Sequence, residues 1–153
     1  MKERKEARVK AMELLLYRSR TEAELRKKLL EREYTEEETD DAVEYVRSFG
    51  YINDSAYAEQ YVLSKGSAKG RAALKRELKK KGVPEETVEE ALAEYPEDDT
   101  DNILALIEKR AGPPHPMDDK EYRRIFGYLA RRGFSGSSIH RAMKMYSESE
   151  SFS

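Results

Sequence analysis

The sequence contains no cysteine and no tryptophan, and it has no long apolar run. Without cysteine the chain can form neither a disulfide framework nor a thiolate metal site, which is typical of proteins in a reducing compartment. A membrane-spanning helix needs roughly 18 consecutive apolar residues, and no segment approaches that length. Residues 1–7 are mostly charged, whereas a secretory signal peptide contains a long apolar stretch. We therefore expect a cytoplasmic protein that does not associate with membranes.

Residues suited to catalysis or metal binding are also scarce. The two histidines, His115 and His140, lie in a proline-rich loop and in the last expected helix, and we expect both to be surface residues. The segment 66–71 is rich in glycine but lacks the GxxxxGK[ST] spacing of a phosphate-binding loop. No recognisable motif pairs a nucleophile with a base. We expect no enzyme activity, no cofactor, no metal and no small-molecule substrate.

Apolar residues are few for a chain of 153 residues, at 38% against 39% charged. A single globule of this size buries roughly two-thirds of the surface of its unfolded chain. A row of small bundles needs fewer apolar residues in each unit. The composition therefore favours an array of small bundles over one large core.

A repeat with a period near fifty residues divides the chain. Leu29, Leu78 and Leu129 are separated by 49 and 51 residues and anchor three copies. The matching positions around them are apolar: Leu25, Leu74 and Ile125 four residues before, Tyr34, Val83 and Phe134 five after, and Val43, Leu92 and Met143 fourteen after. Upstream of each anchor, apolar residues recur at the i, i+3, i+4 spacing of a helix with one buried face. Each copy is therefore expected to hold three helices.

Helix starts are marked by side-chain caps or by proline. The residues expected to begin helices in this way are Thr21, Thr35, Asp54, Pro84, Asp118 and Ser135. Gly82 and Gly133 can adopt the left-handed backbone that ends the second helix of their copies. The first copy has Glu33 at that place, so we expect a different turn there.

The expected helices cover about 3–17, 22–33, 36–49, 55–65, 70–81, 85–95, 100–111, 119–132 and 136–147. The predicted fold class is all-α, with three tandem three-helix-bundle repeats forming an elongated, curved array. The predicted repeats span 1–53, 54–99 and 100–147, followed by a disordered tail at 148–153.

Charge is sorted by helix rather than spread evenly. The segment 69–81 holds seven basic residues and one acidic residue, and 120–132 holds five basic residues and one acidic residue. The third helices of the first two copies are the reverse, with seven acidic residues in 33–46, eight in 85–99 and no basic residue in either. Charged helix faces are usually only solvated. The net charge of −2 nevertheless hides basic and acidic rows that can create local potentials.

Basic side chains recur one helical turn apart in the central basic helix, as Lys75 with Lys79 and Arg76 with Lys80. Such like-charge pairs cost about 0.2–0.5 kcal/mol each, which favours a binding role for them. The basic residues that we predict to contact a protein filament or phosphate are Arg71, Lys75, Arg76, Lys79, Lys80, Arg123, Arg124, Arg131 and Arg132.

Several motifs resemble those of the RecX family of recombinase regulators. They are SRTEAEL at 19–25 followed by Lys28-Leu29, GYIND at 50–54 followed by Tyr57-Ala58, Glu77-Leu78 followed by Lys81-Gly82, and YLARRGFS at 128–135. The resemblance extends from about Ala7 to Tyr146. It implies three tandem three-helix repeats in a cytoplasmic bacterial protein that binds the RecA nucleoprotein filament. It also implies inhibition of strand exchange, ATP hydrolysis and co-protease activity, with no cofactor.

A second hypothesis is a DNA-binding module of the helix-turn-helix kind, in which the third helix of a three-helix unit enters a groove of DNA. In the first two copies that helix is acidic, so phosphate would repel it. Only the third copy has a permissive last helix, with Arg141 and Lys144. We therefore rank filament binding first and direct contact with single- or double-stranded DNA as an accessory. A third hypothesis is a generic helical adaptor.

Overall fold

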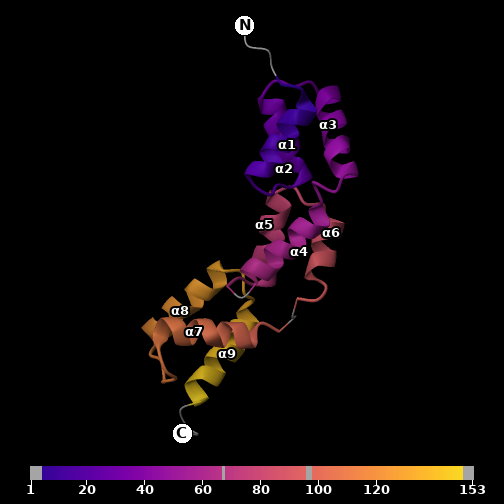
Figure 1. The fold of residues 1–153 in the computed structure, drawn as a ribbon. Coiled ribbons are helices and arrows are strands. Elements are labelled where there is room, and N and C mark those ends of the chain that lie inside the picture. The colour runs from indigo at the N-terminus through magenta and orange to yellow at the C-terminus, as the bar shows by residue number, and fades with distance from the viewer. Residues whose placement is uncertain (1–4, 67, 96–97, 150–153) are drawn as a thin grey trace. The chain divides into compact units, whose positions relative to one another are not determined.

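The computed structural model describes residues 5–66, 68–95 and 98–149 (Figure 1). Within these segments every regular element is a helix, which confirms the all-helical prediction. The helices are α1 (Ala7–Tyr17), α2 (Glu22–Glu31), α3 (Glu36–Ser48), α4 (Asp54–Lys65), α5 (Arg71–Lys80), α6 (Glu85–Leu92), α7 (Thr100–Ala111), α8 (Asp119–Arg131) and α9 (Gly136–Ser149). None of these described helices is long and apolar enough to cross a membrane.

Most helix ends lie within two residues of the predicted ones, and two differ more. Helix α1 begins at Ala7, because Glu6 has an extended backbone with φ −60° and ψ 148°, and residues 3–4 of the predicted helix lie outside the described residues. Helix α6 ends at Leu92 instead of residue 95, where the Tyr95 amide turns back to donate to the Leu92 carbonyl at 3.0 Å. At the other end of the chain α9 continues to Ser149. The last four residues of the predicted tail lie outside the described residues.

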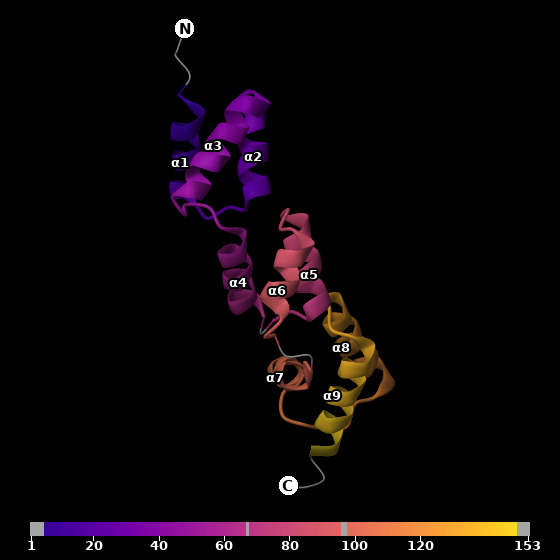
Figure 2. The ribbon, with the colours of Figure 1, turned by 90° about the vertical axis from the view of Figure 1, so that its right-hand side faces the viewer.

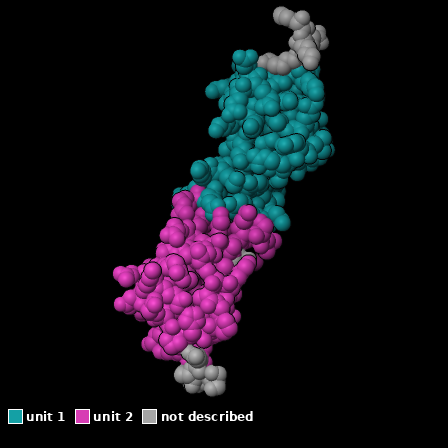
Figure 3. Space-filling model, turned by 90° about the vertical axis from the view of Figure 1, so that its left-hand side faces the viewer, with its two compact units in different colours: residues 1–61, 77–91 teal, residues 62–76, 92–153 magenta. Residues whose placement is uncertain are grey.

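The chain forms two compact units (Figure 3). Unit 1 contains residues 1–61 and 77–91, and unit 2 contains residues 62–76 and 92–153. The middle predicted repeat, 54–99, is therefore divided between the units, and the division falls within α4 and within α5. The repeats are units of sequence and local structure, whereas the compact units are groups of residues in mutual contact.

In unit 1 the core lies between α1, α2 and α3, which lie together as a bundle (Figure 2). Leu25 and Leu29 of α2 are fully buried against Ala11 of α1 and Val43 of α3. Burying each leucine side chain contributes about 1.5–3 kcal/mol. The anchor positions found in the sequence are therefore core positions here.

In unit 2 the corresponding core lies between α7, α8 and α9. Ile125 and Leu129 of α8 pack with Ile103 and Ile107 of α7, and all four are at most 1% exposed. Tyr146 of α9 is 1% exposed, and its hydroxyl donates to the Gly112 and Pro113 carbonyls at 2.8 and 2.9 Å. This bond ties the proline-rich loop to the end of the bundle.

The predicted N-terminal caps are mostly confirmed. Thr21 and Thr35 both form complete capping boxes, and the carboxylate of Asp118 accepts from the Glu121 amide at 2.8 Å. The prediction for Asp54 is wrong, because the side chain of Asn53 caps α4 by accepting from the Ala56 amide at 3.1 Å. Asp54 instead accepts at 2.9 Å from the amide of Glu22, the first residue of α2. Its carboxylate thus satisfies one of the unpaired amides at the start of another helix.

The turn that follows the second helix has the same geometry in all three repeats. The amides of Tyr34, Val83 and Phe134 donate back to the anchor leucine carbonyls at 3.3, 3.1 and 3.4 Å. Glu33 has φ 68°, close to the 89° of Gly82 and the 88° of Gly133. The expectation of a different first turn is therefore wrong, because Glu33 adopts the left-handed conformation despite its side chain.

Glycine is needed in the second and third turns for a second reason, which is close packing. A Cβ on Gly82 would lie 2.2 Å from the Cβ of Ala23, at the start of α2. A Cβ on Gly133 would lie 2.4 Å from the Cβ of Ala73, at the start of α5. Each contact lies within one unit. Glu33 is exposed, so only its backbone angle is strained.

Substitutions at the two turns of unit 1 should therefore have opposite effects on stability. We expect Gly82→Ala to lower the free energy of unfolding by about 2–4 kcal/mol, from the left-handed backbone and the overlap with Ala23. We expect Glu33→Gly to raise it by about 0.5–1 kcal/mol, because relief of left-handed strain exceeds the entropy cost of glycine. Urea unfolding followed by circular dichroism measures both. A destabilising Glu33→Gly would contradict this explanation of the turn.

Candidate functional site

The first half of α5 is joined to the end of α8 within unit 2. The Gly70 amide donates to the Arg132 carbonyl at 2.8 Å, and Nη1 of Arg132 donates to the Ala68 carbonyl at 3.0 Å. The guanidinium of Arg132 also lies 4.7 Å from the ring centroid of Tyr128. Arg132, a predicted partner-binding residue, therefore holds the segment before α5 in place.

Arg71 has a similar internal role. Its Nη1 donates to the carbonyls of Leu92 and Tyr95 at 3.0 and 3.3 Å, which satisfies the end of α6. The Tyr95 hydroxyl in turn donates to the Gly66 and Lys69 carbonyls, both at 2.8 Å. These bonds connect the end of α6 to the loop that precedes α5.

The other predicted binding residues have exposed or half-exposed side chains. In unit 2 these are Lys75, Arg76, Arg123, Arg124 and Arg131, and in unit 1 they are Lys79 and Lys80. Lys79 pairs with Glu85 at 3.1 Å, Arg124 approaches Glu121 at 4.0 Å, and Nε of Arg123 donates to the Asp119 carbonyl at 3.3 Å. Surface pairs of this kind are weak, so these cations can exchange partners at low cost.

In unit 1 the end of α5 meets the start of α2. The Thr21 hydroxyl donates to the Lys81 carbonyl at 2.6 Å while it accepts from the Glu24 amide at 3.1 Å. Gly82 lies against Ala23 at the same place. One threonine hydroxyl thus both caps α2 and fastens the end of α5 to it.

A groove of about 600 Å³ follows this junction. Its basic lining residues are Arg18, Arg20, Lys27, Lys28, Lys80 and Lys81. Only Lys80 belongs to the predicted set, because the sequence reasoning scored charge by helix and α2 is mixed in charge. The other basic residues of the groove could have been suggested by the run of Arg26, Lys27 and Lys28 in α2. The basic end of α5, in the second repeat, lies opposite this run.

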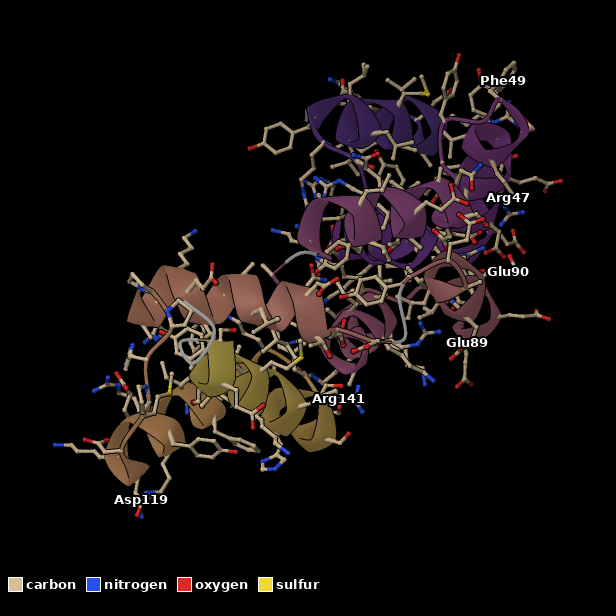
Figure 4. The ribbon with its side chains drawn as sticks, turned by 90° about the horizontal axis from the view of Figure 1, so that it is seen from below. Arg47, Phe49, Glu89, Glu90, Asp119 and Arg141 are labelled. Atoms are coloured by element: carbon tan, nitrogen blue, oxygen red, sulfur yellow. The ribbon has the colours of Figure 1, made fainter. Side chains whose placement is uncertain are left out.

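Exposed aromatic residues form a second surface feature of unit 1 that sequence reasoning missed. At the end of α3, Tyr45 meets Phe49 edge to face with ring centroids 5.0 Å apart, and Phe49 stacks on Tyr51 with centroids 5.8 Å apart. Phe49 and Tyr51 are 59% and 53% exposed. The Arg8 guanidinium lies 4.6 Å from the Tyr45 ring centroid. Figure 4 shows Phe49 at the outer edge of the bundle.

The acidic third helices carry exposed carboxylates. Glu36 and Glu37 of α3 are exposed, as are Glu89 and Glu90 on the outer side of α6 (Figure 4). In α9, the permissive last helix, Arg141 lies 3.5 Å from Asp98. Acidic faces in two repeats therefore oppose the use of their third helices on DNA.

In the part of the chain that the structure describes, the titratable side chains form no metal centre. Among the described residues no group of three or more histidine, aspartate or glutamate side chains could hold a metal ion. His115 is half-buried rather than on the surface, since its ring contacts Glu121 at 2.8 Å and the Tyr146 hydroxyl at 3.1 Å. His140 is exposed and lies 3.0 Å from the Tyr122 hydroxyl. Both contacts are explained by packing of the third bundle.

The described residues thus form three-helix domains with charged outer surfaces and, in unit 1, exposed aromatic side chains, which defines a helical repeat protein. Models of the first, second and third RecX three-helix domains match residues 7–45, 53–92 and 97–143. The chain belongs to the RecX family of regulatory proteins, as the sequence motifs indicated. This confirms the prediction of three tandem three-helix domains.

Named relatives and solved structures agree with this assignment. Regulatory protein RecX of Trichlorobacter lovleyi is 38% identical over 84% of this chain and 88% of its own length. Regulatory protein RecX of Xanthomonas oryzae pv. oryzae is 33% identical over 88% of this chain and 85% of its own. The crystal structure of RecX from Lactobacillus salivarius has a TM-score of 0.77 at 25% identity, covering 92% of this chain and 94% of that one.

Two tyrosines at the junctions should titrate unusually late. Burial raises the pKa of Tyr95 to about 12, and burial with the Glu77 hydrogen bond raises the pKa of Tyr61 to about 12. A tyrosine in the unfolded chain titrates near 10. The raised pKa therefore stabilises the fold fully below about pH 10, and this stability is lost as the pH rises towards 12.

Phenolate absorbance during an alkaline titration measures the ionisation of these tyrosines. We expect Tyr95→Phe and Tyr61→Phe each to remove one late-titrating group. Tyr95→Phe should also reduce the loss of stability between about pH 10 and 12. Ionisation of Tyr95 near pH 10, as in an unfolded chain, would contradict the hydrogen-bonded position described for it.

Proposed function

We propose that this protein binds the RecA recombinase nucleoprotein filament and inhibits its strand exchange, ATP hydrolysis and co-protease activities, in the cytoplasm of a bacterium. The observation that carries this function is the match of all three domains to the RecX regulatory family. Regulation of recombination and of the DNA-damage response would follow from inhibition of the filament. The protein acts by binding, without a cofactor or catalytic step of its own.

The surfaces support a large macromolecular partner. Exposed aromatic and arginine side chains are enriched where proteins bind proteins, and Phe49, Tyr51 and Arg8 provide such a patch in unit 1. The exposed cations of unit 2, among them Arg76 and Arg131, complement carboxylates or phosphates of a filament. A nucleoprotein filament offers both kinds of surface to one ligand.

Direct DNA binding through helix-turn-helix geometry is the second candidate function. The basic residues Arg141 and Lys144 of α9 favour it in the third domain. The exposed acids of α3 and α6 oppose it in the other two domains, because a reading helix must lie against phosphates. We therefore propose DNA contact as an accessory to filament binding.

Charge reversal of exposed cations in unit 2 tests the proposed function. Arg76 and Arg131 lie on different helices, α5 and α8, and both are exposed. We expect Arg76→Glu/Arg131→Glu to fold with unchanged helicity and to weaken inhibition of RecA filaments at least tenfold, because each change replaces attraction by repulsion. Co-sedimentation with preformed filaments and the filament's ATP hydrolysis rate are the two measurements.

The matched control reverses two charges on the acidic helix α6. Glu89→Lys/Glu90→Lys changes two exposed side chains that the proposal leaves outside the binding surface. We expect it to inhibit the filament nearly as well as the parent protein. Full inhibition by Arg76→Glu/Arg131→Glu would show that these cations are only solvated, and failure of the parent protein to inhibit would overturn the proposed function.

A further inference from the structure

The basic groove of unit 1 has features expected of an anion-binding site. It lies between the start of α2, with the residues before it, and the end of α5, and all of its lining residues belong to unit 1. Six basic side chains line it against three carboxylates, those of Glu24, Glu31 and Glu77. Glu24 is engaged in the capping box with Thr21, and Glu77 accepts from the Tyr61 hydroxyl at 3.0 Å. Two of the three carboxylates therefore have structural partners already.

Arg20 provides an independent sign that an anionic group belongs in this groove. The residue is only 6% exposed, and its Nε donates to the Leu14 carbonyl at 3.2 Å. Its Nη1 is buried and has no hydrogen-bond acceptor among the described residues. Burying a charged donor without an acceptor is unfavourable, and most such donors in proteins are paired. Arg20 also lines the groove, so a rotation of its guanidinium towards a phosphate oxygen seated there would give Nη1 its acceptor.

The lysines of the groove are available for a ligand. Lys27 and Lys80 are exposed and come from opposite elements, α2 and α5. Lys81 lies with Nζ 5.9 Å from the ring centroid of Tyr61, at the edge of the same groove. The arrangement combines a buried arginine with mobile ammonium groups, which suits phosphate groups that follow one another along a chain.

We propose that this groove binds the phosphodiester backbone of single-stranded DNA. A single strand carries one negative charge on every nucleotide and bends freely, so consecutive phosphates can meet Arg20 and the lysines in turn. The acidic helices α3 and α6 confine this contact to the groove. The choice of nucleic acid rests on the proposed function, in which the partner is a nucleoprotein filament.

A similar basic junction occurs in unit 2, where the end of α8 meets the start of α5. Lys80 and Lys81 stand before Gly82 in the first junction, and Arg131 and Arg132 stand before Gly133 in the second. Cations thus occupy the same sequence positions at both junctions. In unit 2, however, Arg132 donates to the Ala68 carbonyl, so only Arg131 of that pair has an exposed side chain.

The test uses the full chain and a short fluorescent oligothymidylate, with binding followed by anisotropy over a range of salt concentrations. The variant Lys27→Gln/Lys80→Gln removes two charges from opposite sides of the groove. We expect its affinity at low salt to fall at least tenfold. The slope of log K against log salt should become shallower by about 1.4, since each phosphate contact on single-stranded DNA contributes about 0.7.

The matched control is Lys10→Gln/Arg26→Gln, which removes two charges from the same unit outside the groove. Lys10 lies near Glu13 at 3.6 Å and Arg26 pairs with Asp40, so both are in weak surface pairs. We expect this control to keep the parent's affinity and nearly its slope. Equal weakening in both variants would mean that only the overall charge matters, and parent-like binding by Lys27→Gln/Lys80→Gln would also overturn the proposal.

A third variant, Arg20→Lys, keeps the charge but replaces the planar guanidinium, and with it Nη1, by a single ammonium group. We expect it to weaken oligothymidylate binding at least fivefold at unchanged helicity, whereas unchanged binding would contradict the role of Nη1. A duplex of the same length should bind more weakly, because a stiff duplex cannot bend to bring successive phosphates to Arg20 and the lysines.

RecA filaments assayed in parallel separate this proposal from the proposed function. If the groove variant loses filament inhibition while the parent has no affinity for oligothymidylate, the groove takes an acidic protein surface and the DNA proposal is wrong. If the parent binds oligothymidylate through the groove but does not inhibit filaments, the groove assignment holds and the filament function fails.

Discussion

The structure depends on one close contact between neighbouring repeats. A glycine in a left-handed turn packs against an alanine at the start of the second helix of the repeat next to it. Gly82 against Ala23 forms it in unit 1, and Gly133 against Ala73 forms it in unit 2. Any side chain at either glycine would overlap the alanine. The turn joins the second helix of its repeat to the third, and it also packs against the second helix of another repeat. One contact in each unit therefore fixes the end of one helix against the start of another.

Charge sorting follows partly from this arrangement. The basic residues that precede the turn lie at the C-terminal ends of α5 and α8, where cations interact favourably with the helix dipole. The acidic residues after the turn of unit 1 lie at the start of α6, where anions do. Helix stability thus explains why basic and acidic runs alternate along the chain. It does not explain the basic residues of α2 and the buried Arg20, which face the same junction from the other side.

Local features could be predicted from the sequence, and contacts between distant segments could not. The anchors Leu29, Leu78 and Leu129 are all fully buried, because a helical apolar stripe needs only nearby residues to identify it. Of the capping residues, Thr21 and Asp118 act as expected, but Asp54 bonds to the start of α2, 32 positions away. The filament surface itself remains a prediction.

Charge alone does not identify which cations of the candidate site are exposed. Arg71 and Arg132 are as basic as their neighbours, yet both donate to backbone carbonyls of segments distant in sequence. A charge count cannot separate a cation that completes the fold from one that faces solvent. The same limitation hid Lys27 and Lys28, whose helix carries balancing glutamates and whose partners in the groove come from another repeat.

The two junctions have diverged in a way that bears on function. In unit 2 the junction is closed by a backbone bond from Gly70 to Arg132 and by the guanidinium of Arg132 itself, so that cation is committed to the fold. In unit 1 the Thr21 hydroxyl closes the junction through the Lys81 carbonyl, which leaves the lysine side chain at the edge of the groove. Because the Thr21 hydroxyl closes the junction of unit 1, no basic side chain is needed there in the way that Arg132 is needed in unit 2. The basic side chains of unit 1 therefore stay available for a ligand.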